Sequence, residues 1–178
     1  EVLDIVYNDK TIAEVLELSV NEASGMFSAI PKIFRPLKAL KDTGLGYLKL
    51  GQTSPTLSGG EAQRVRLVTH LLSGISDNAA RLNPDSRKNL FLLEEPTIGL
   101  HMADVRRLVG VLQRLVGGGH TVLVIEHNLD LIAAADWVID LGPEGGEAGG
   151  QIIAQGTPPE IAKTRHSHTG RFLKRFFG

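Results

Sequence analysis

Glycine, serine and glutamate cluster where a helix is predicted to begin. The run Leu57-Ser58-Gly59-Gly60-Glu61 is followed by Ala62, Gln63 and Arg64. The two glycines leave backbone amides bare at the helix N-terminus, and Ser58 adds a hydroxyl donor. Because the positive end of the helix dipole lies at the same place, the segment is suited to phosphate oxygens. From these residues alone, an ordinary turn with a helix cap is an equally good interpretation.

Two adjacent carboxylates follow an apolar run. Leu90-Phe91-Leu92-Leu93 leads into Glu94, Glu95 and Pro96, and such a run is typical of a strand buried on both faces. Ligands of open α/β sheets bind beyond the carboxyl ends of the strands. There one carboxylate could support Mg²⁺, and the other could orient or deprotonate a water that attacks a phosphoryl group. Two solvated acids at a strand end are the alternative.

A histidine follows the next predicted strand. His127 comes after the apolar run Val122–Ile125 and Glu126. The carboxyl ends of parallel strands meet at one sheet edge, so we expect His127 beside Glu95, where its imidazole could contact a terminal phosphate. A purely structural histidine is the alternative.

The elements that would carry these residues fall into two regions. The pairs Thr11–Glu14 and Ser19–Glu22 have capping-box spacing, and Pro31 suits the first turn of a third helix. We therefore expect a helical lead-in over residues 1–50 and a signature and acid-pair subdomain over residues 51–178. Predicted strands of the second region cover residues 90–93, 122–125, 137–141 and 151–154, and a glycine-rich turn over residues 142–150 precedes the last of them, a returning strand.

Helical segments separate the first three of these strands. Apolar residues from Val105 to Val116 follow helical spacing, and Leu129–Ala135 forms a shorter helix with Asn128 as its N-cap. A strand–helix–strand–helix–strand order predicts an α/β fold with a parallel sheet and right-handed crossovers.

Composition restricts the class of protein. The chain has 178 residues, 42% of them hydrophobic, which suits one domain with a core. It has no cysteine, which excludes disulfides and thiolate metal sites. Its net charge of −1 gives no support for autonomous DNA binding.

No apolar run approaches the roughly 20 residues that span a bilayer, so we expect a cytoplasmic protein without membrane contact. The absence of an initial Met indicates a fragment.

The C-terminus combines cations with aromatic side chains. Lys163, Arg165, Arg171, Lys174 and Arg175 accompany three phenylalanines. This pattern is found at nucleic-acid interfaces, but an amphipathic helix docked on the domain is the favoured interpretation.

Taken in order, these motifs resemble the ABC superfamily of ATPases. Residues 57–61 resemble the signature sequence, residues 90–96 the Walker B strand, residues 97–101 the D-loop, and His127 the switch histidine. Four stretches look like the UvrA family of excision-repair ATPases rather than a transporter. These are residues 44–52, Gly99-Leu100-His101, residues 124–130 and residues 139–146.

The resemblance implies a P-loop NTPase-like ABC fold and composite ATP sites. Leu57, Ser58, Gly59, Gly60, Glu61 and Gln63 would bind ATP that is held by a partner nucleotide-binding domain. Glu95 would position or activate water, Glu94 would support Mg²⁺, and His127 would sense the γ-phosphate. The resemblance further implies damaged DNA and other excinuclease subunits as partners, a homodimer, and ATP hydrolysis coupled to damage recognition in nucleotide excision repair.

Two features depart from the family pattern. No Gly-x-x-x-x-Gly-Lys-Ser/Thr phosphate loop is present, so we expect the isolated chain to be inactive as an ATPase. Glu94 replaces the usual Asp, which moves the carboxylate by about an ångström and can cost roughly 100-fold in rate. The rival interpretations are the ATPase half of an ABC transporter and a non-catalytic ABC-shaped interaction module.

Overall fold

The chain divides into two compact units, residues 1–125 and residues 126–178. The structure is a computed structural model that describes residues 5–76, 88–142 and 150–178. Residue 50, the predicted boundary, falls inside the first unit. Among the described residues, no helix is both long and apolar enough to span a membrane.

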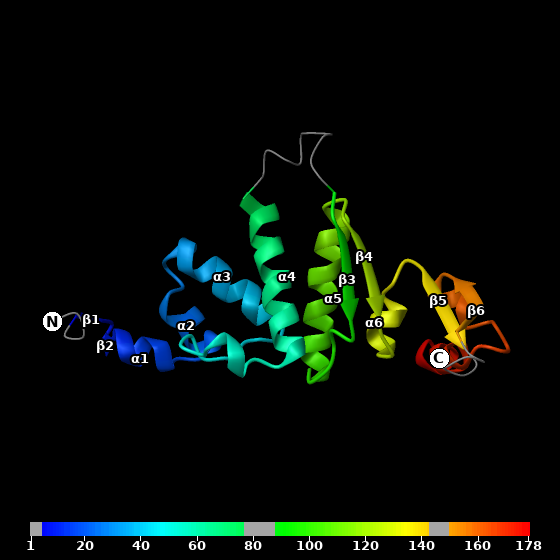
Figure 1. Cartoon of the computed structure of the whole chain (residues 1–178), viewed down its shortest axis with the longest axis horizontal. Helices are drawn as coiled ribbons and strands as arrows, with labels where there is room; N and C mark the ends of the chain where they lie inside the picture. Colours follow the sequence, from blue (N-terminus) through cyan, green and yellow to red (C-terminus); the bar gives the residue numbers. More distant parts are fainter. Residues whose placement is uncertain (1–4, 77–87, 143–149) are drawn as a thin grey trace. The chain divides into compact units, whose positions relative to one another are not determined.

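The first unit is mainly helical, with one parallel strand pair (Figure 1). Its elements are β1 (Val6–Tyr7), β2 (Lys10–Thr11), α1 (Ile12–Glu17), α2 (Val20–Met26), α3 (Pro31–Asp42), a 3₁₀ turn (Ser54–Thr56), α4 (Gly59–Ser76), β3 (Leu90–Glu94), α5 (Met102–Gly117) and β4 (Thr121–Ile125). The second unit contains α6 (Leu129–Ala133), β5 (Val138–Gly142), β6 (Gln151–Gly156), α7 (Pro158–Ile161) and α8 (His168–Phe176).

Local capping starts the first two helices where the sequence predicts. The Glu14 carboxylate accepts from the Thr11 amide at 2.7 Å, and the Glu22 carboxylate accepts from the Ser19 amide at 2.8 Å. Each hydroxyl in turn accepts from the amide of its glutamate, which completes both capping boxes. Hydrogen bonds from the amide and hydroxyl of Thr11 lower the pKa of Glu14 below its ordinary value, and those from the hydroxyl and amide of Ser19 do the same for the pKa of Glu22.

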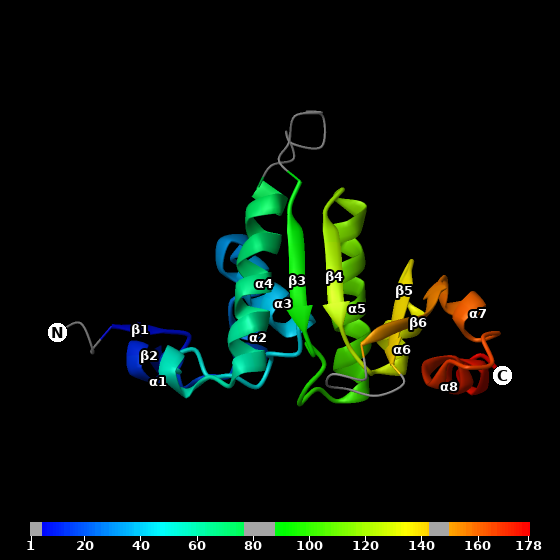
Figure 2. The same cartoon turned by 45° about the vertical axis from the view of Figure 1, so that its right-hand side comes forward.

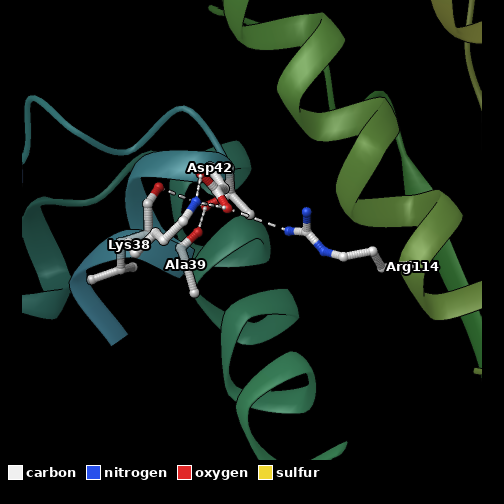
Figure 3. A network of polar contacts seen from close by, with 6 residues as sticks. Lys38, Ala39, Asp42 and Arg114 are labelled. Carbon is white, nitrogen blue, oxygen red and sulfur yellow. Dashed lines mark hydrogen bonds and ion pairs between the residues drawn. The ribbon is translucent and has the colours of Figure 1, made fainter. Parts of the chain in front are cut away.

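Helices α2 and α3 pack around a small apolar core, which places the start of α4. The core residues are Val20, Ala23, Leu37, Leu45 and Leu48, with Leu57 and Val65 packed against them. At the end of α3, Asp42 accepts from Lys38 at 2.9 Å and from Arg114 of α5 at 3.4 Å (Figure 3). Since both cations are largely exposed, each ion pair contributes at most about 1 kcal/mol.

Strands β3 and β4 pair in parallel, with Leu90 opposite Thr121 and Glu94 opposite Ile125. On one face Leu93 is buried, and the Phe91 ring packs edge-on against His70 and His120, at 5.3 and 5.6 Å between ring centroids. Figure 2 shows α5 next to β4.

The other face of this strand pair is bare. Leu90, Leu92, Leu123 and Ile125 are 52–65% exposed. The prediction that the strand at residues 90–93 is buried on both faces is therefore wrong, because the described helices of the first unit leave these side chains exposed.

The prediction of a third strand in the parallel sheet is also wrong. β5 pairs antiparallel with β6 inside the second unit, with a register shift between Asp140 and Leu141. An antiparallel pair needs no crossover helix, so α6 before β5 does not imply a parallel partner. The predicted glycine-rich turn over residues 142–150 lies mostly outside the described residues.

A buried carboxylate docks the C-terminal helix. Asp140 of β5 accepts from the Ser167 hydroxyl at 2.5 Å and from the Thr169 hydroxyl at 2.8 Å. Ser167 in turn caps α8 by accepting from the Gly170 amide at 2.6 Å. Leu173 of α8 is fully buried. The interpretation of the C-terminus as a docked amphipathic helix is confirmed.

Gly170 permits this docking. A Cβ atom at this position would collide with the carbonyl oxygen of Ile161 in α7, whereas a Cβ at Gly110 of α5 would meet nothing within 4 Å. We predict that Gly170→Ala displaces α8, and that amide hydrogen exchange of α8 accelerates strongly. The matched change Gly110→Ala should instead stabilise α5 by about 0.5–1 kcal/mol, because alanine favours a helix interior. Unchanged protection of α8 in Gly170→Ala would contradict this packing.

Candidate functional site

A capping box builds the first turn of α4. The Ser58 hydroxyl accepts from the Glu61 amide at 3.3 Å, and the Glu61 carboxylate accepts from the Ser58 amide at 2.7 Å. Glu61 also accepts from the Tyr47 hydroxyl. The Glu61 carboxylate is therefore engaged in local structure, while the Ser58 hydroxyl keeps a hydrogen that it can donate. Leu57 packs against the α2–α3 core and positions the turn.

The glycines of this turn offer donors to a ligand. The first amides of an α-helix have no partner within the helix, and Gly59 and Gly60 occupy these positions. A Cβ at Gly59 would meet nothing within 4 Å, so packing within this chain does not demand glycine there. The missing side chain instead leaves the amides open to close approach by a phosphate.

The acid pair ends β3 in a strained turn. Glu94 is the last strand residue, and Glu95 has a φ of 43°, in the left-handed region. Such a conformation costs a non-glycine residue of order 1–3 kcal/mol, and it persists only when surrounding contacts impose it. Here the Glu95 amide donates to Ile125 of β4 at 2.8 Å, and the Glu95 carbonyl accepts from Ile98 at 3.1 Å.

Gln63 holds the end of β3 from its other edge. Successive residues of a strand direct their N–H and C=O groups to opposite edges, so Glu94 faces away from β4 when Glu95 bonds to it. With its amide oriented to match donor with acceptor, Gln63 donates to the Glu94 carbonyl at 3.2 Å and accepts from the Glu94 amide at 3.0 Å. The side chain predicted to bind nucleotide thus positions the acid pair.

Arg64 secures the residues after the acids, a role that the motifs in the sequence do not predict. It is 2% exposed, and its guanidinium donates to the carbonyls of Pro96 at 3.1 Å and Ile98 at 3.2 Å. Helical spacing with the buried Leu67 and Val68 could have revealed it, because a buried arginine requires acceptors. Helix α4 and the acid turn are therefore fastened together by two adjacent side chains.

The glycine turn and the acid pair open onto one hollow of about 500 Å³. Its lining residues are Gly59, Gly60, Ala62, Gln63, Arg66, Glu94, Glu95 and Ile98. The structure thus brings three of the predicted signature residues, Gly59, Gly60 and Gln63, to the same hollow as both acids, whereas Leu57, Ser58 and Glu61 are not among its lining residues. Two carboxylates and one guanidinium face this space, so phosphates would need an additional cation there.

His127 belongs to the second unit, and its approach to Glu95 stays a prediction. Its backbone is ordered locally: the Glu126 carboxylate accepts from the His127 amide at 2.8 Å and from the Asn128 amide at 2.9 Å. Asn128 in turn caps α6, as predicted, by accepting from the Asp130 amide. The imidazole is exposed.

Comparison with known proteins identifies the family. The chain is 54% identical over 176 residues to UvrABC system protein A of Aquifex aeolicus, and 56% identical over 174 residues to that of Pasteurella multocida. These matches cover 99% and 98% of the chain, but only 18% and 17% of the two relatives. The chain belongs to the UvrA family.

A solved structure agrees with this assignment. UvrA2 of Deinococcus radiodurans matches with a TM-score of 0.79 and 44% identity, over 98% of this chain and 20% of that one. No protein-family model matches the chain. The predicted α/β ABC ATPase fold, in a family of DNA-repair ABC ATPases, is confirmed. The chain spans about a fifth of the length of these relatives.

Removing the Arg64 guanidinium should loosen the acid turn. Arg64→Met keeps most of the side-chain volume but leaves two buried carbonyls without a donor. We therefore predict a loss of about 2–4 kcal/mol in the free energy of urea unfolding. The matched change Arg66→Met, on the exposed side of the same helix, should stay within about 0.5 kcal/mol. Equal effects of the two substitutions would contradict the fastening role of Arg64.

Acid should weaken the start of α4. Hydrogen bonds from the Tyr47 hydroxyl and the Ser58 amide lower the pKa of Glu61 below its ordinary value of 4.5. A carboxylate with a depressed folded-state pKa stabilises the fold above its unfolded pKa, and this contribution is lost as the pH falls through the folded value. We predict that Glu61→Gln flattens the stability curve below about pH 4.5, measured by urea unfolding. Tyr47→Phe should flatten it partially, and unchanged curves in both variants would contradict this.

Proposed function

We propose that this chain supplies the signature motif and the acid pair of a DNA-repair ABC ATPase. In the whole protein, ATP hydrolysis is coupled to recognition of damaged DNA in nucleotide excision repair. The observation that carries the proposal is the single hollow where the bare amides of α4 meet the strained acid turn. Membership in the UvrA family supports the same role.

The signature residues would bind a terminal phosphate. Gly59 and Gly60 donate from their amides, Ser58 donates from its hydroxyl, and the α4 dipole adds a favourable field. In ABC composite sites, the partner nucleotide-binding domain holds this ATP. Leu57, Glu61 and Gln63 act indirectly, since their side chains pack the turn, cap it and hold Glu94.

The acid pair suits Mg²⁺ bound together with ATP. Among the described residues, no group of three or more His, Asp or Glu side chains could hold a metal. Mg²⁺ commonly takes one or two carboxylates plus substrate phosphates and waters, and Glu94 fits that mode. When bound, the ion would reduce the electrostatic repulsion between the phosphate oxygens and the two carboxylates.

Glu95 would orient or deprotonate the attacking water. Its strained backbone is fixed through Ile125 and Ile98, so its carboxylate stays at the edge of the hollow. His127 would sense the γ-phosphate. It follows Ile125 by two residues, and covalent geometry alone keeps its Cα within about 7 Å of that strand end.

A non-catalytic interaction module of the same shape is the second candidate. The observation that favours it is Glu94 in place of the family's usual Asp. The two candidates differ in one measurable property, which is hydrolysis that depends on Glu95.

The proposed role also includes a homodimer and association with other excinuclease subunits in the cytoplasm.

We predict that the isolated chain does not hydrolyse ATP in steady state, because no phosphate loop is present. A chimera in which this chain replaces the matching segment of the Aquifex aeolicus relative should hydrolyse ATP. Glu95→Gln in the chimera should lower turnover by about 100- to 10,000-fold, the usual contribution of a general base. Phosphate release is the measurement.

The matched control is Glu17→Gln, the same chemical change on the exposed helix α1, which should leave turnover unchanged. A folded chimera with no turnover, or with turnover that survives Glu95→Gln, would favour the non-catalytic module. Hydrolysis by the isolated chain that disappears on Glu95→Gln would refute the composite arrangement.

A further inference from the structure

Positive charge is concentrated at the C-terminal end of the chain. Residues 157–178 contain five of the nineteen Lys and Arg residues but only one of the twenty acidic residues, although the whole chain has a net charge of −1. The one acid, Glu160, accepts from the Thr157 amide and hydroxyl, both at 2.7 Å. It therefore caps α7 and is committed to that local role.

Four of these cations surround a hollow of about 670 Å³ between α7 and α8. They are Lys163, Arg165, Arg171 and Lys174, and Phe177 completes the charged and aromatic part of the lining. None of the described lining residues is acidic. The Arg171 guanidinium lies 2.6 Å from the His168 ring, which carries no negative charge that could neutralise it. The hollow thus presents several cations to a polyanion.

Helix α8 carries two of these cations. Arg171 and Lys174 are three residues apart and so lie on one side of the helix, and Phe177 follows as its C-cap residue. Asp140 and Ser167 anchor the helix N-terminus, and Leu173 is fully buried beneath it. A docked helix loses little further conformational freedom when it binds a ligand.

Exposed aromatic rings accompany the cations. Phe172, Phe176 and Phe177 are 54%, 44% and 49% exposed, and the last two meet edge-on with ring centroids 5.9 Å apart. Phenyl faces next to cations suit nucleobases, since every base offers a flat face to stack. An acidic peptide would use the charges but not the rings. A bilayer would need the apolar face of α8, which Leu173 already buries in the unit.

We propose that this surface, formed by Lys163, Arg165, Arg171, Lys174 and Phe177, binds single-stranded nucleic acid. The cations contact successive backbone phosphates, and Phe177 stacks on a base. The biological relevance of this ligand rests on the proposed DNA-repair role, but the binding itself does not depend on ATP hydrolysis.

The test uses the 178-residue chain and a fluorescein-labelled oligothymidylate of about 16 nucleotides. Fluorescence anisotropy is measured between about 50 and 200 mM salt. Arg171→Gln with Lys174→Gln should weaken binding by about 10- to 100-fold at low salt, and should reduce the slope of log K against log salt by about 1.4. Phe177→Ala should weaken binding by about 5- to 150-fold with the slope unchanged.

The control is Lys32→Gln with Arg35→Gln, which removes the same charge from exposed positions on α3. It should leave affinity and slope close to those of the unsubstituted chain. Equal losses from both double variants would assign binding to overall charge and overturn the proposal. Absence of binding, or tighter binding of polyglutamate or of phosphatidylserine vesicles, would also overturn it.

The ATPase chimera separates this proposal from the proposed function. Arg171→Gln with Lys174→Gln in the chimera should leave basal ATP turnover unchanged, because neither residue belongs to the nucleotide hollow. Failure of the Glu95 test would leave the oligonucleotide result standing. Failure of the oligonucleotide test would leave the acid pair and its chemistry untouched.

Discussion

The attachment of helix α4 to the turn after β3 is the interaction on which the site depends. Gln63 binds both backbone groups of Glu94, and Arg64 binds the carbonyls of Pro96 and Ile98. Without these bonds, the acid turn would lose its side-chain links to α4. With them, the phosphate-binding amides and the carboxylates become parts of one rigid element, which is what chemistry at a phosphate requires.

This attachment explains why an unfavourable backbone can persist. Glu95 adopts a left-handed conformation that a glutamate resists, and Arg64 is a buried cation whose desolvation is costly. Each group supplies what the other needs. The carbonyls of the turn accept hydrogen bonds from the buried guanidinium, and these bonds in turn hold the strained turn in place. Strain at a functional residue, held by buried polar contacts, is the usual signature of a preorganised site.

Local features of the fold were predictable from the sequence, and long-range ones were not. The capping boxes at Thr11 and Ser19 involve residues three apart, so spacing alone predicted both helix starts correctly. The acceptors of Arg64 lie more than thirty residues away, and no spacing rule connects them. An apolar run such as residues 90–93 reports that a strand is apolar, but not how many layers cover it within this chain. The strand and helix spacing also did not show that β5 pairs with β6, the strand that follows it, and does not extend the parallel pair.

Amide hydrogen exchange in the isolated chain tests the attachment most directly. If α4 and the acid turn open together, the amides of Glu95 and Ile98 should exchange with an opening free energy within about 1 kcal/mol of that at Leu67, in the middle of α4. Exchange of Glu95 and Ile98 at the rate of an unprotected loop, while Leu67 stays protected, would contradict the account.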